Sequence, residues 1–588
     1  MTNRRHPGFW VLATGAIAAW TLFVYWPFFE GYYFLDDYAF ITIARYTDNP
    51  VLYFSETHFP GGLFYRPAGM LLWWLIGAID PGMQTQFVAN WLLLVAAATL
   101  FLAVLIKAGL PRWPSLIVAL LFCTHPVSTM TAGWLSNRFD LLASLGMFLA
   151  LLGALRWFKG SADRRALMLV ACGTLVAVTS KETGLITPLV ILVLALSSGD
   201  PRVRYWPLWI SGFVAAMYLL VRQALTTGAD SLLLQEGAAH ALVQGVRVWL
   251  VRAPEFLLRT PEAGSTVALA LLFVAVLLFC AALLRLTLSR GTDVLRKQSG
   301  AVVFLLGLVI VATTIVIQFP SVSNSILAKH DANEFDSDHY LAARFFYFGL
   351  IGALMMLAGS VSMAIDWARL RNIATGRTGG VARMTAAMAV MLLLWFHGDR
   401  SREQGIRWVQ LSGGNNAVVA RAAAEAISMR VPENPENREA CRFYLLGTQD
   451  FAPTFWFFSD TAVKASVSSK VALQLGRCMI STESTPWYHV LRAAPAGSPA
   501  ELPQTGPLLR TCSDGVPIKP QAFATVEIHF MSYPHSGAIL RPASGDRVLS
   551  YDIERSQFVD VTDQVAAGDR QVKLKWSRLE QNRCVDNR

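Results

Sequence analysis

The chain alternates between long apolar runs and short polar connections. Runs of roughly twenty apolar residues are long enough, as helices, to cross ~30 Å of hydrocarbon. A further apolar stretch, 67–79, is too short to span and predicts a re-entrant or interfacial helix. The pattern therefore predicts a polytopic α-helical membrane protein with about eleven spans. The runs lie at 9–29, 84–106, 114–133, 139–158, 165–180, 183–198, 205–224, 264–285, 300–318, 344–364 and 384–397.

The last part of the chain has a different pattern. After the membrane part, 1–397, the segment 398–588 lacks long apolar runs and opens with a helical stretch near 400–428 and a Pro/Asn/Glu-rich linker at 431–438. Short alternating stretches predict strands. No repeat of about 34 residues is present, which argues against a helical-repeat array. We expect a small α/β or β-rich domain, with strands at 442–447, 524–530 and 572–576 and a helix at 455–463.

Composition and charge agree with a membrane protein. Hydrophobic residues make up 54% of the 588 residues and charged residues only 15%, values unusual for a soluble globule. Lys and Arg fall in alternate connections, such as Lys107, Arg156 and Arg202, so the positive-inside rule puts the N-terminus in the cytoplasm. The net charge of +10 is then explained by topology, without nucleic-acid binding. Arg4 and Arg5 precede the first run without an Ala-x-Ala cleavage site, which predicts a retained signal anchor.

An odd number of spans puts segment 398–588 outside, in an oxidising compartment. Cys123, Cys172 and Cys280 lie in apolar runs, where burial as small hydrophobes is expected. The even number of cysteines in the outer segment predicts two disulfides with three alternative pairings, and the lack of Cys-x-x-Cys spacing disfavours zinc. These cysteines are Cys441, Cys478, Cys512 and Cys584.

Paired acids follow the first span. Asp36 and Asp37 lie in the first outer loop, which runs from Glu30 to Arg66. A carboxylate at the mouth of a membrane cavity suits a general base, because partial desolvation raises its pKa. Because the two acids are adjacent, one can act while the other positions or caps. The alternative is a pair that only caps an amphipathic helix at 38–46.

Further polar residues lie at the predicted outer ends of other spans. Each group has a purely structural alternative: a capping Arg–Asp pair, a core histidine or a polar turn. The outer loop 319–343 is acidic, so its oxygen ligands could bind a divalent metal. Its acids lack EF-hand spacing, which favours a solvated face instead; they are Asp331, Glu334, Asp336 and Asp338. The grouped residues are Arg66, His125, Arg138 with Asp140, Lys181 with Glu182, and Arg344; His58 lies in the first loop.

Taken in order, these motifs resemble those of a known superfamily. They comprise Asp-Asp after the first span, Tyr65-Arg66-Pro67, His125-Pro126 followed by Arg-x-Asp-Leu-Leu-Ala, Ser-Lys-Glu, and Arg344 among aromatics. Residues 9–364 thereby resemble the GT-C polytopic glycosyltransferases, most of all the transmembrane and tetratricopeptide-repeat O-mannosyltransferases and their bacterial relatives. The likeness to protein mannosyltransferases and the lipid A aminoarabinose transferase is more distant. Two features depart from that family. The repeats are missing and the C-terminal domain takes their place, which puts a protein acceptor in doubt; loop 319–343 is also more acidic than the family pattern.

The resemblance implies an inverting enzyme that moves a sugar from a polyprenyl-phosphate donor to an acceptor hydroxyl. Asp36 is then the favoured base and Asp37 the second candidate. Arg344 and Arg138 are the first choices for the lipid phosphate, because guanidinium groups hold phosphate with two hydrogen bonds. Lys181 is expected to be held by Glu182, with Arg66 as a further cation and His125 as a donor to phosphate or sugar.

The implied setting is a bacterial inner membrane, with the C-terminal domain in the periplasm. The implied partners are the lipid-linked donor, membrane lipid, and a glycan, lipid or protein acceptor, with no nucleic acid. The resemblance implies no definite cofactor, and a divalent metal stays open. A flippase or transporter of lipid-linked glycans is the competing hypothesis, and an inactive envelope scaffold is a third. The charged residues gather at one face rather than at the bilayer midplane, and no inverted repeat is seen, which disfavours transport.

Overall fold

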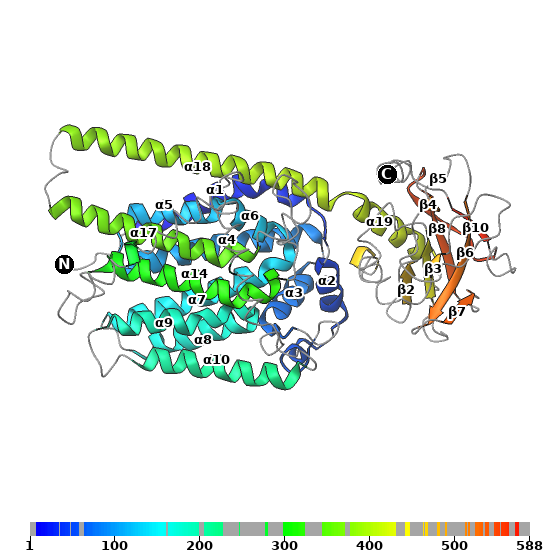
Figure 1. Ribbon diagram of the computed structural model, residues 1–588, viewed down its shortest axis with the longest axis horizontal. Coiled ribbons are helices and arrows are strands. Elements are labelled where there is room, and N and C mark those ends of the chain that lie inside the picture. The colour runs from blue at the N-terminus through cyan, green and yellow to red at the C-terminus, as the bar shows by residue number, and fades with distance from the viewer. Residues whose placement is uncertain are drawn as a thin grey trace. The chain divides into compact units, whose positions relative to one another are not determined.

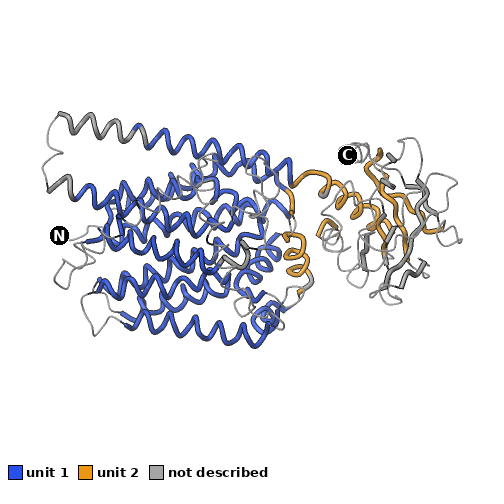
Figure 2. The backbone as a smooth tube through the Cα atoms, viewed as in Figure 1, with its two compact units in different colours: residues 1–31, 49–411 blue, residues 32–48, 412–588 orange. Residues whose placement is uncertain are grey.

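The computed structural model divides into two compact units, which we describe separately. Unit 1 comprises residues 1–31 and 49–411, and unit 2 comprises 32–48 and 412–588 (Figure 2). The structure describes residues 7–34, 36–47, 49–57, 64–80, 82–159, 163–198, 205–226, 298–323, 344–370 and 377–430, together with isolated residues in 246–281 and the short segments 442–446, 463, 465–467, 479–482, 489–490, 512–513, 516–517, 524–532, 536–539, 546–552, 554–563 and 571–574.

Unit 1 is a helical bundle (Figure 1). Among the described helices, six are long and apolar enough to cross a membrane: Pro7–Glu30, Met83–Ala108, Leu135–Phe158, Trp206–Leu225, Ser299–Ile317 and Arg344–Asp366. The helices of this unit are α1 (Pro7–Tyr25), α3 (Pro67–Ile79), α4 (Met83–Ala108), α5 (Arg112–Thr124), α6 (Pro126–Gly133), α7 (Arg138–Phe158), α8 (Arg164–Ser180), α9 (Ile186–Leu196), α10 (Trp206–Leu225), α14 (Ser299–Ser323), α17 (Tyr347–Leu370) and α18 (Arg377–Ser412). Short 3-10 helices are η1 (Trp26–Glu30), η2 (Pro50–Phe54), η4 (Leu135–Asn137), η5 (Glu182–Leu185) and η8 (Arg344–Phe346).

Most predicted apolar runs are confirmed as helices with similar bounds, and the short run at 67–79 is α3. Two expectations need correction. The run at 114–133 is not one straight helix, because it breaks into α5 and α6 with a 49° bend; the pair is either a broken span or a re-entrant segment. Pro126 lacks an amide proton and disfavours a helical residue before it, so His125 is extended at φ −65° and ψ 138°. The run at 384–397 is part of the longer α18, which passes through the expected boundary at 397/398. Run 264–285 lies almost wholly outside the described residues, so the total of eleven spans stays a prediction.

Glycines allow two helix pairs to pack closely. On α14 and α17, an added Cβ at Gly307 would lie 2.4 Å from the carbonyl oxygen of Gly352, and one at Gly359 would lie 2.5 Å from that of Gly300. The same holds for α7 and α8, where a Cβ at Gly146 would lie 2.4 Å from the amide nitrogen of Ala177. Small residues at such crossings let membrane helices associate through backbone contact.

Unit 2 combines helices with several small sheets. Its helices among the described residues are α2 (Asp36–Tyr46) and α19 (Asn415–Ser428). The first sheet has the order β2-β1-β8-β9, with β1 parallel to both neighbours and β8 antiparallel to β9. In the second, β6 pairs antiparallel with β3, β7 and β10. The strands are β1 (Arg442–Leu446), β2 (Met479–Thr482), β3 (His489–Val490), β4 (Cys512–Ser513), β5 (Val516–Pro517), β6 (Ala524–Ser532), β7 (Ser536–Ile539), β8 (Arg547–Asp552), β9 (Gln557–Asp560) and β10 (Gln571–Leu574).

The predicted α/β character and the three predicted strands are confirmed as β1, β6 and β10. The expected helix at 455–463 lies outside the described residues except for Val463. Cys441, Cys478 and Cys584 also lie outside them, and only the backbone of Cys512 is described, so the disulfides stay a prediction. In unit 1, Cys123 is buried as expected, whereas Cys172 is exposed on α8, so that expectation was wrong. Cys280 lies outside the described residues.

The close packing of α14 and α17 at their glycines predicts that an added methyl group destabilises the protein there but not at an open glycine. Gly307→Ala should lower the free energy of unfolding by about 1–3 kcal/mol, because α14 and α17 must separate to admit the Cβ. Gly212→Ala is the control, since a Cβ on that α10 glycine meets nothing within 4 Å and should leave stability unchanged or slightly raised. Reversible unfolding in mixed micelles measures both; equal stability of the two variants would contradict the packing described.

Candidate functional site

Asp36 and Asp37 have different surroundings at the start of α2. The Asp37 side chain is fully buried, and its Oδ2 accepts a hydrogen bond of 3.0 Å from the backbone amide of Phe34. The Asp37 amide in turn donates to the Phe34 carbonyl oxygen at 3.1 Å. Asp36 is partly exposed. Asp37 therefore closes the turn before the helix, and Asp36 is the acid of the pair that retains access to solvent.

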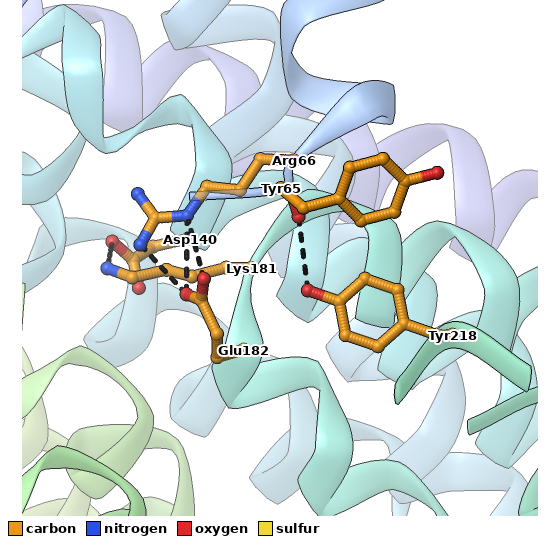
Figure 3. Close-up of polar contacts among 6 residues, drawn as sticks. All are labelled: Tyr65, Arg66, Asp140, Lys181, Glu182 and Tyr218. Atoms are coloured by element: carbon orange, nitrogen blue, oxygen red, sulfur yellow. Dashed lines mark hydrogen bonds and ion pairs between the residues drawn. The ribbon is translucent and has the colours of Figure 1, made fainter. Parts of the chain in front are cut away.

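Lys181 pairs with a buried carboxylate on α7. Its Nζ lies 2.5 Å from Oδ2 of Asp140, whose side chain has no exposed surface, while that of Lys181 is 15% exposed (Figure 3). Asp140 lies in the first turn of α7, and Lys181 follows the last residue of α8. The second carboxylate oxygen of Asp140 is buried with no hydrogen-bond partner among the described residues. The pair joins the ends of two helices that pack along their length.

Arg66 pairs with Glu182 immediately beside it. Arg66 Nη2 and Nε donate to Oε2 of Glu182 at 2.8 and 3.2 Å, with both side chains largely buried (Figure 3). The Arg66 guanidinium also lies 4.4 Å from the ring centroid of Phe64. The expectation that Glu182 holds Lys181 is thus wrong. Lys181 is extended, at φ −159° and ψ 153°, between the end of α8 and the start of η5, and this break in the helical backbone lets its side chain and that of Glu182 reach different partners.

Electrostatics connects these two pairs with two further arginines. Burial lowers the pKa of Lys181, the positive charges of Arg66 and Arg344 lower it further, and Asp140 opposes both effects. Burial by itself would raise the pKa of Glu182, but Arg66 and Arg222 outweigh it and hold that pKa below its ordinary value. The cluster so defined contains four cations and two carboxylates, an excess of two positive charges. We call it the cation cluster: Arg66, Lys181, Arg222, Arg344, Asp140 and Glu182.

Arg222 was not among the residues singled out in the sequence. It lies in the last turn of α10. The predicted topology puts this end of the helix outside, where the positive-inside rule expects few arginines. That departure from the rule is the signal in the sequence that points to Arg222.

Arg138 is fully buried and holds helices together. Its Nε donates to Oδ1 of Asn90 at 3.0 Å, and its Nη1 to Oε1 of Gln86 at 2.8 Å. The guanidinium carbon lies 3.7 Å from the ring centroid of Trp73. These contacts join α7 to α4 and α3 and hold much of the guanidinium inside the protein. Phosphate binding by Arg138 stays a prediction, and the contacts favour a positioning role.

The remaining predicted residues lie at helix breaks. Nδ1 of His125 accepts a hydrogen bond of 3.2 Å from the amide of Val127, so this buried histidine caps α6. Its ring lies 4.9 Å from that of His397, centroid to centroid. Arg344 begins η8, with its guanidinium 4.8 Å from the ring centroid of Trp134. His58 lies outside the described residues.

Two tyrosines fix the end of the loop that leads into Arg66. Tyr218 of α10 donates a hydrogen bond of 3.1 Å to the carbonyl oxygen of Tyr65 (Figure 3). The two rings stack at 5.9 Å, and the Tyr65 hydroxyl donates to the carbonyl oxygen of Phe54 at 2.9 Å. The backbone before Arg66 is thereby anchored, which restricts where its guanidinium can lie.

Two expectations about the site stay open. Among the described residues, no three His, Cys, Asp or Glu side chains gather closely enough to hold a metal. The acidic loop 319–343 that suggested a metal has no described side chains. Asp36 belongs to unit 2 and the cation cluster to unit 1, so their predicted proximity stays a prediction.

Comparison with known proteins gives a weak likeness. No family model matches the chain, and no curated protein matches it. The oligosaccharyltransferase of Archaeoglobus fulgidus in complex with Zn and sulfate is 13% identical, with a TM-score of 0.40 over 80% of this chain and 62% of that one. The oligosaccharyltransferase AglB of the same organism, in complex with an inhibitory peptide and a dolichol-phosphate, is 11% identical, with a TM-score of 0.41 over 78% and 63%. The chain spans less than two thirds of these proteins, and TM-scores below 0.5 do not establish a shared fold.

The Arg66–Glu182 pair predicts a specific pH dependence. Arg66→Met should lower the free energy of unfolding by about 3 kcal/mol at neutral pH, because Glu182 is left charged and unpaired. The pair contributes fully above the ordinary glutamate pKa of about 4.3, and the contribution is lost as the pH falls through the lowered pKa of Glu182. The difference in stability between wild type and variant should therefore shrink on acidification.

Thermal unfolding across pH 3–8 measures this difference. Arg156→Met is the matched control, because Arg156 and its partner Asp163 are much more exposed and should contribute about 0–1 kcal/mol. A difference for Arg66→Met that is independent of pH, or no larger than that of the control, would contradict the pairing.

Proposed function

We propose that this protein is an inverting glycosyltransferase, which moves a sugar from a polyprenyl-phosphate donor to an acceptor hydroxyl. The observation that carries the proposal is the cation cluster, whose core is the two largely buried ion pairs Arg66–Glu182 and Lys181–Asp140, beside helices that are apolar enough to lie in a bilayer. A lipid-linked phosphate has the complementary parts: an apolar tail for the bilayer and a negative headgroup for the cations. The motif order described above supports the same assignment.

The cluster suits a departing phosphate because its cations are fixed in advance. Lys181 is held by Asp140 and Arg66 by Glu182. Arg344 lies against Trp134. Groups that are already oriented toward developing charge stabilise a transition state without reorganising during the reaction. Arg66, Lys181 and Arg344 bind the phosphate in this proposal, Arg222 adds positive potential, and Arg138 keeps α7 and α4 in register.

Asp36 is the general base. As the acceptor oxygen forms its bond to the anomeric carbon, the bond from that carbon to the phosphate oxygen breaks, and the hydroxyl proton passes to the Asp36 carboxylate. The electron pair of the broken bond stays on the lipid phosphate, and attack opposite to it inverts the anomeric centre. Asp37 supports Asp36 by capping α2.

The setting of the reaction is part of the proposal. The enzyme works in a bacterial inner membrane, with the chemistry and the C-terminal domain on the periplasmic side, where that domain carries its disulfides. The acceptor is a glycan, lipid or protein hydroxyl. A divalent metal is not needed for the steps above, since the cluster supplies positive charge; whether one assists is answered by adding a chelator to the assay below.

Transfer by the purified protein from synthetic polyprenyl-phosphate sugars tests this function. Asp36→Asn should lower turnover by about 100- to 10,000-fold, the range for loss of a general base, while donor binding is retained. Glu56→Gln is the control, because this acid is exposed and lies in unit 1 on the same predicted outer loop. Unchanged turnover in Asp36→Asn, or an equal loss in both variants, would contradict the assignment of the base.

A further inference from the structure

The helix that carries the acid pair belongs structurally to the C-terminal part of the chain. Residues 32–48 form one compact unit with 412–588, although the whole sequence between them, 49–411, belongs to the other unit (Figure 2). Positions 32–48 are therefore an insertion of the early chain into unit 2. The contacts that hold this insertion lie near both of its ends.

The first contacts are made near the beginning of the insertion. The backbone amide of Tyr32 donates a hydrogen bond of 3.2 Å to the hydroxyl of Ser412, which is almost fully buried. Arg421 of α19 lies over the Tyr32 ring, with 4.7 Å from the guanidinium carbon to the ring centroid. Its Nη1 also donates to the Tyr32 hydroxyl at 3.5 Å. This end of the insertion is thus attached to α19 and the residues before it.

The second set of contacts is made at the other end of α2. Arg45 lies in the last turn of the helix, and its Nη1 donates to the carbonyl oxygen of Ala465 at 2.7 Å and to that of Val467 at 3.4 Å. Ala465 and Val467 are both buried, and the Val467 amide bonds to the carbonyl oxygen of Val463. A single arginine therefore ties α2 to a short turn of the C-terminal domain.

These ties matter because α2 is too short to be stable alone. It has 11 residues, fewer than the ~12–15 that an isolated helix needs in water. Asp37, Ile41 and Arg45 are four residues apart in succession and so share one face of the helix. The hydrogen bonds of Arg45 therefore hold the same face of α2 that carries Asp37 in its first turn. Asp36 is the residue directly before Asp37.

We infer that Arg45 and Arg421 are positioning residues, which fix the acid-bearing helix α2 to the C-terminal domain. The domain is in this sense part of the catalytic centre, because it sets where Asp36 lies. The mechanical part of the inference stands by itself, and its catalytic consequence rests on the proposed function. The two parts make separate, measurable claims.

Hydrogen exchange in the full-length protein tests the mechanical part. Arg45→Met keeps the length of the side chain but removes its hydrogen bonds. Because hydrogen bonds to charged groups stabilise the closed state of a helix, the amides of 37–47 should exchange about tenfold faster in this variant. Arg45→Lys, which keeps a cationic donor, should restore part of the protection. Arg421→Met loosens the other end and should act on the same peptide, which keeps the test decisive if Arg45→Met does not fold.

Arg430→Met is the matched control. Arg430 also lies beside α19 and also bonds to a backbone carbonyl, that of Ala426, and to Asp560, but it does not contact the insertion in any bond described. Exchange of 37–47 as slow in Arg45→Met and Arg421→Met as in wild type would overturn the inference. Equal acceleration in Arg430→Met would overturn it too, since the effect would then be general loosening of the domain.

The catalytic consequence is read from transfer kinetics of the same variants. Because the donor phosphate is assigned to unit 1, Arg45→Met should lower kcat about tenfold and leave the KM for the donor unchanged, with partial recovery in Arg45→Lys. Faster exchange with kcat unchanged would overturn the positioning role. Faster exchange in a protein whose wild type transfers no sugar would instead contradict the proposed function and leave the tie between α2 and the domain intact.

Discussion

The structure depends on keeping charge inside an apolar bundle. A lysine or a carboxylate taken out of water is costly unless an opposite charge lies within contact distance. The cost of desolvation is large for Asp140, because its side chain has no exposed surface. The ammonium group of Lys181, at 2.5 Å, offsets that cost. Arg66 does the same for Glu182. Each ion pair joins segments distant in sequence, so the arrangement of these segments and the positions of the cations are set by the same contacts.

Other described contacts of unit 1 support that arrangement. Arg138 joins α7 to α4 through Gln86 and Asn90, and so fixes the first turn of the helix that carries Asp140. Glycines at Gly146 and Gly173 allow α7 and α8 to approach closely, which brings the end of α8 and the following Lys181 toward that turn. The break at His125-Pro126 redirects the chain before the same turn.

Hydrophobic patterning in the sequence located most helices, because apolar run length and periodicity are local properties. It could not assign the ion pairs. Lys181 and Glu182 are adjacent, yet their partners, Asp140 and Arg66, lie on different segments that the tertiary fold brings to either residue. Nor could it show that Asp37 is buried as a cap, that Arg222 joins the cluster, or that residues 32–48 belong with the C-terminal domain. Those facts depend on tertiary contacts between distant segments.

The central claim is that the cation cluster binds a lipid-linked phosphate. Binding of a short-chain prenyl phosphate to the protein in nanodiscs tests it most directly, because binding can be measured without sugar transfer. Arg344→Met should weaken binding about tenfold or more, because it removes a cation that the proposed function assigns to the phosphate. Lys107→Met removes a cation from the last turn of α4 and should leave the affinity unchanged. Equal affinity of Arg344→Met and wild type, or equal loss in the two variants, would contradict phosphate binding by the cation cluster.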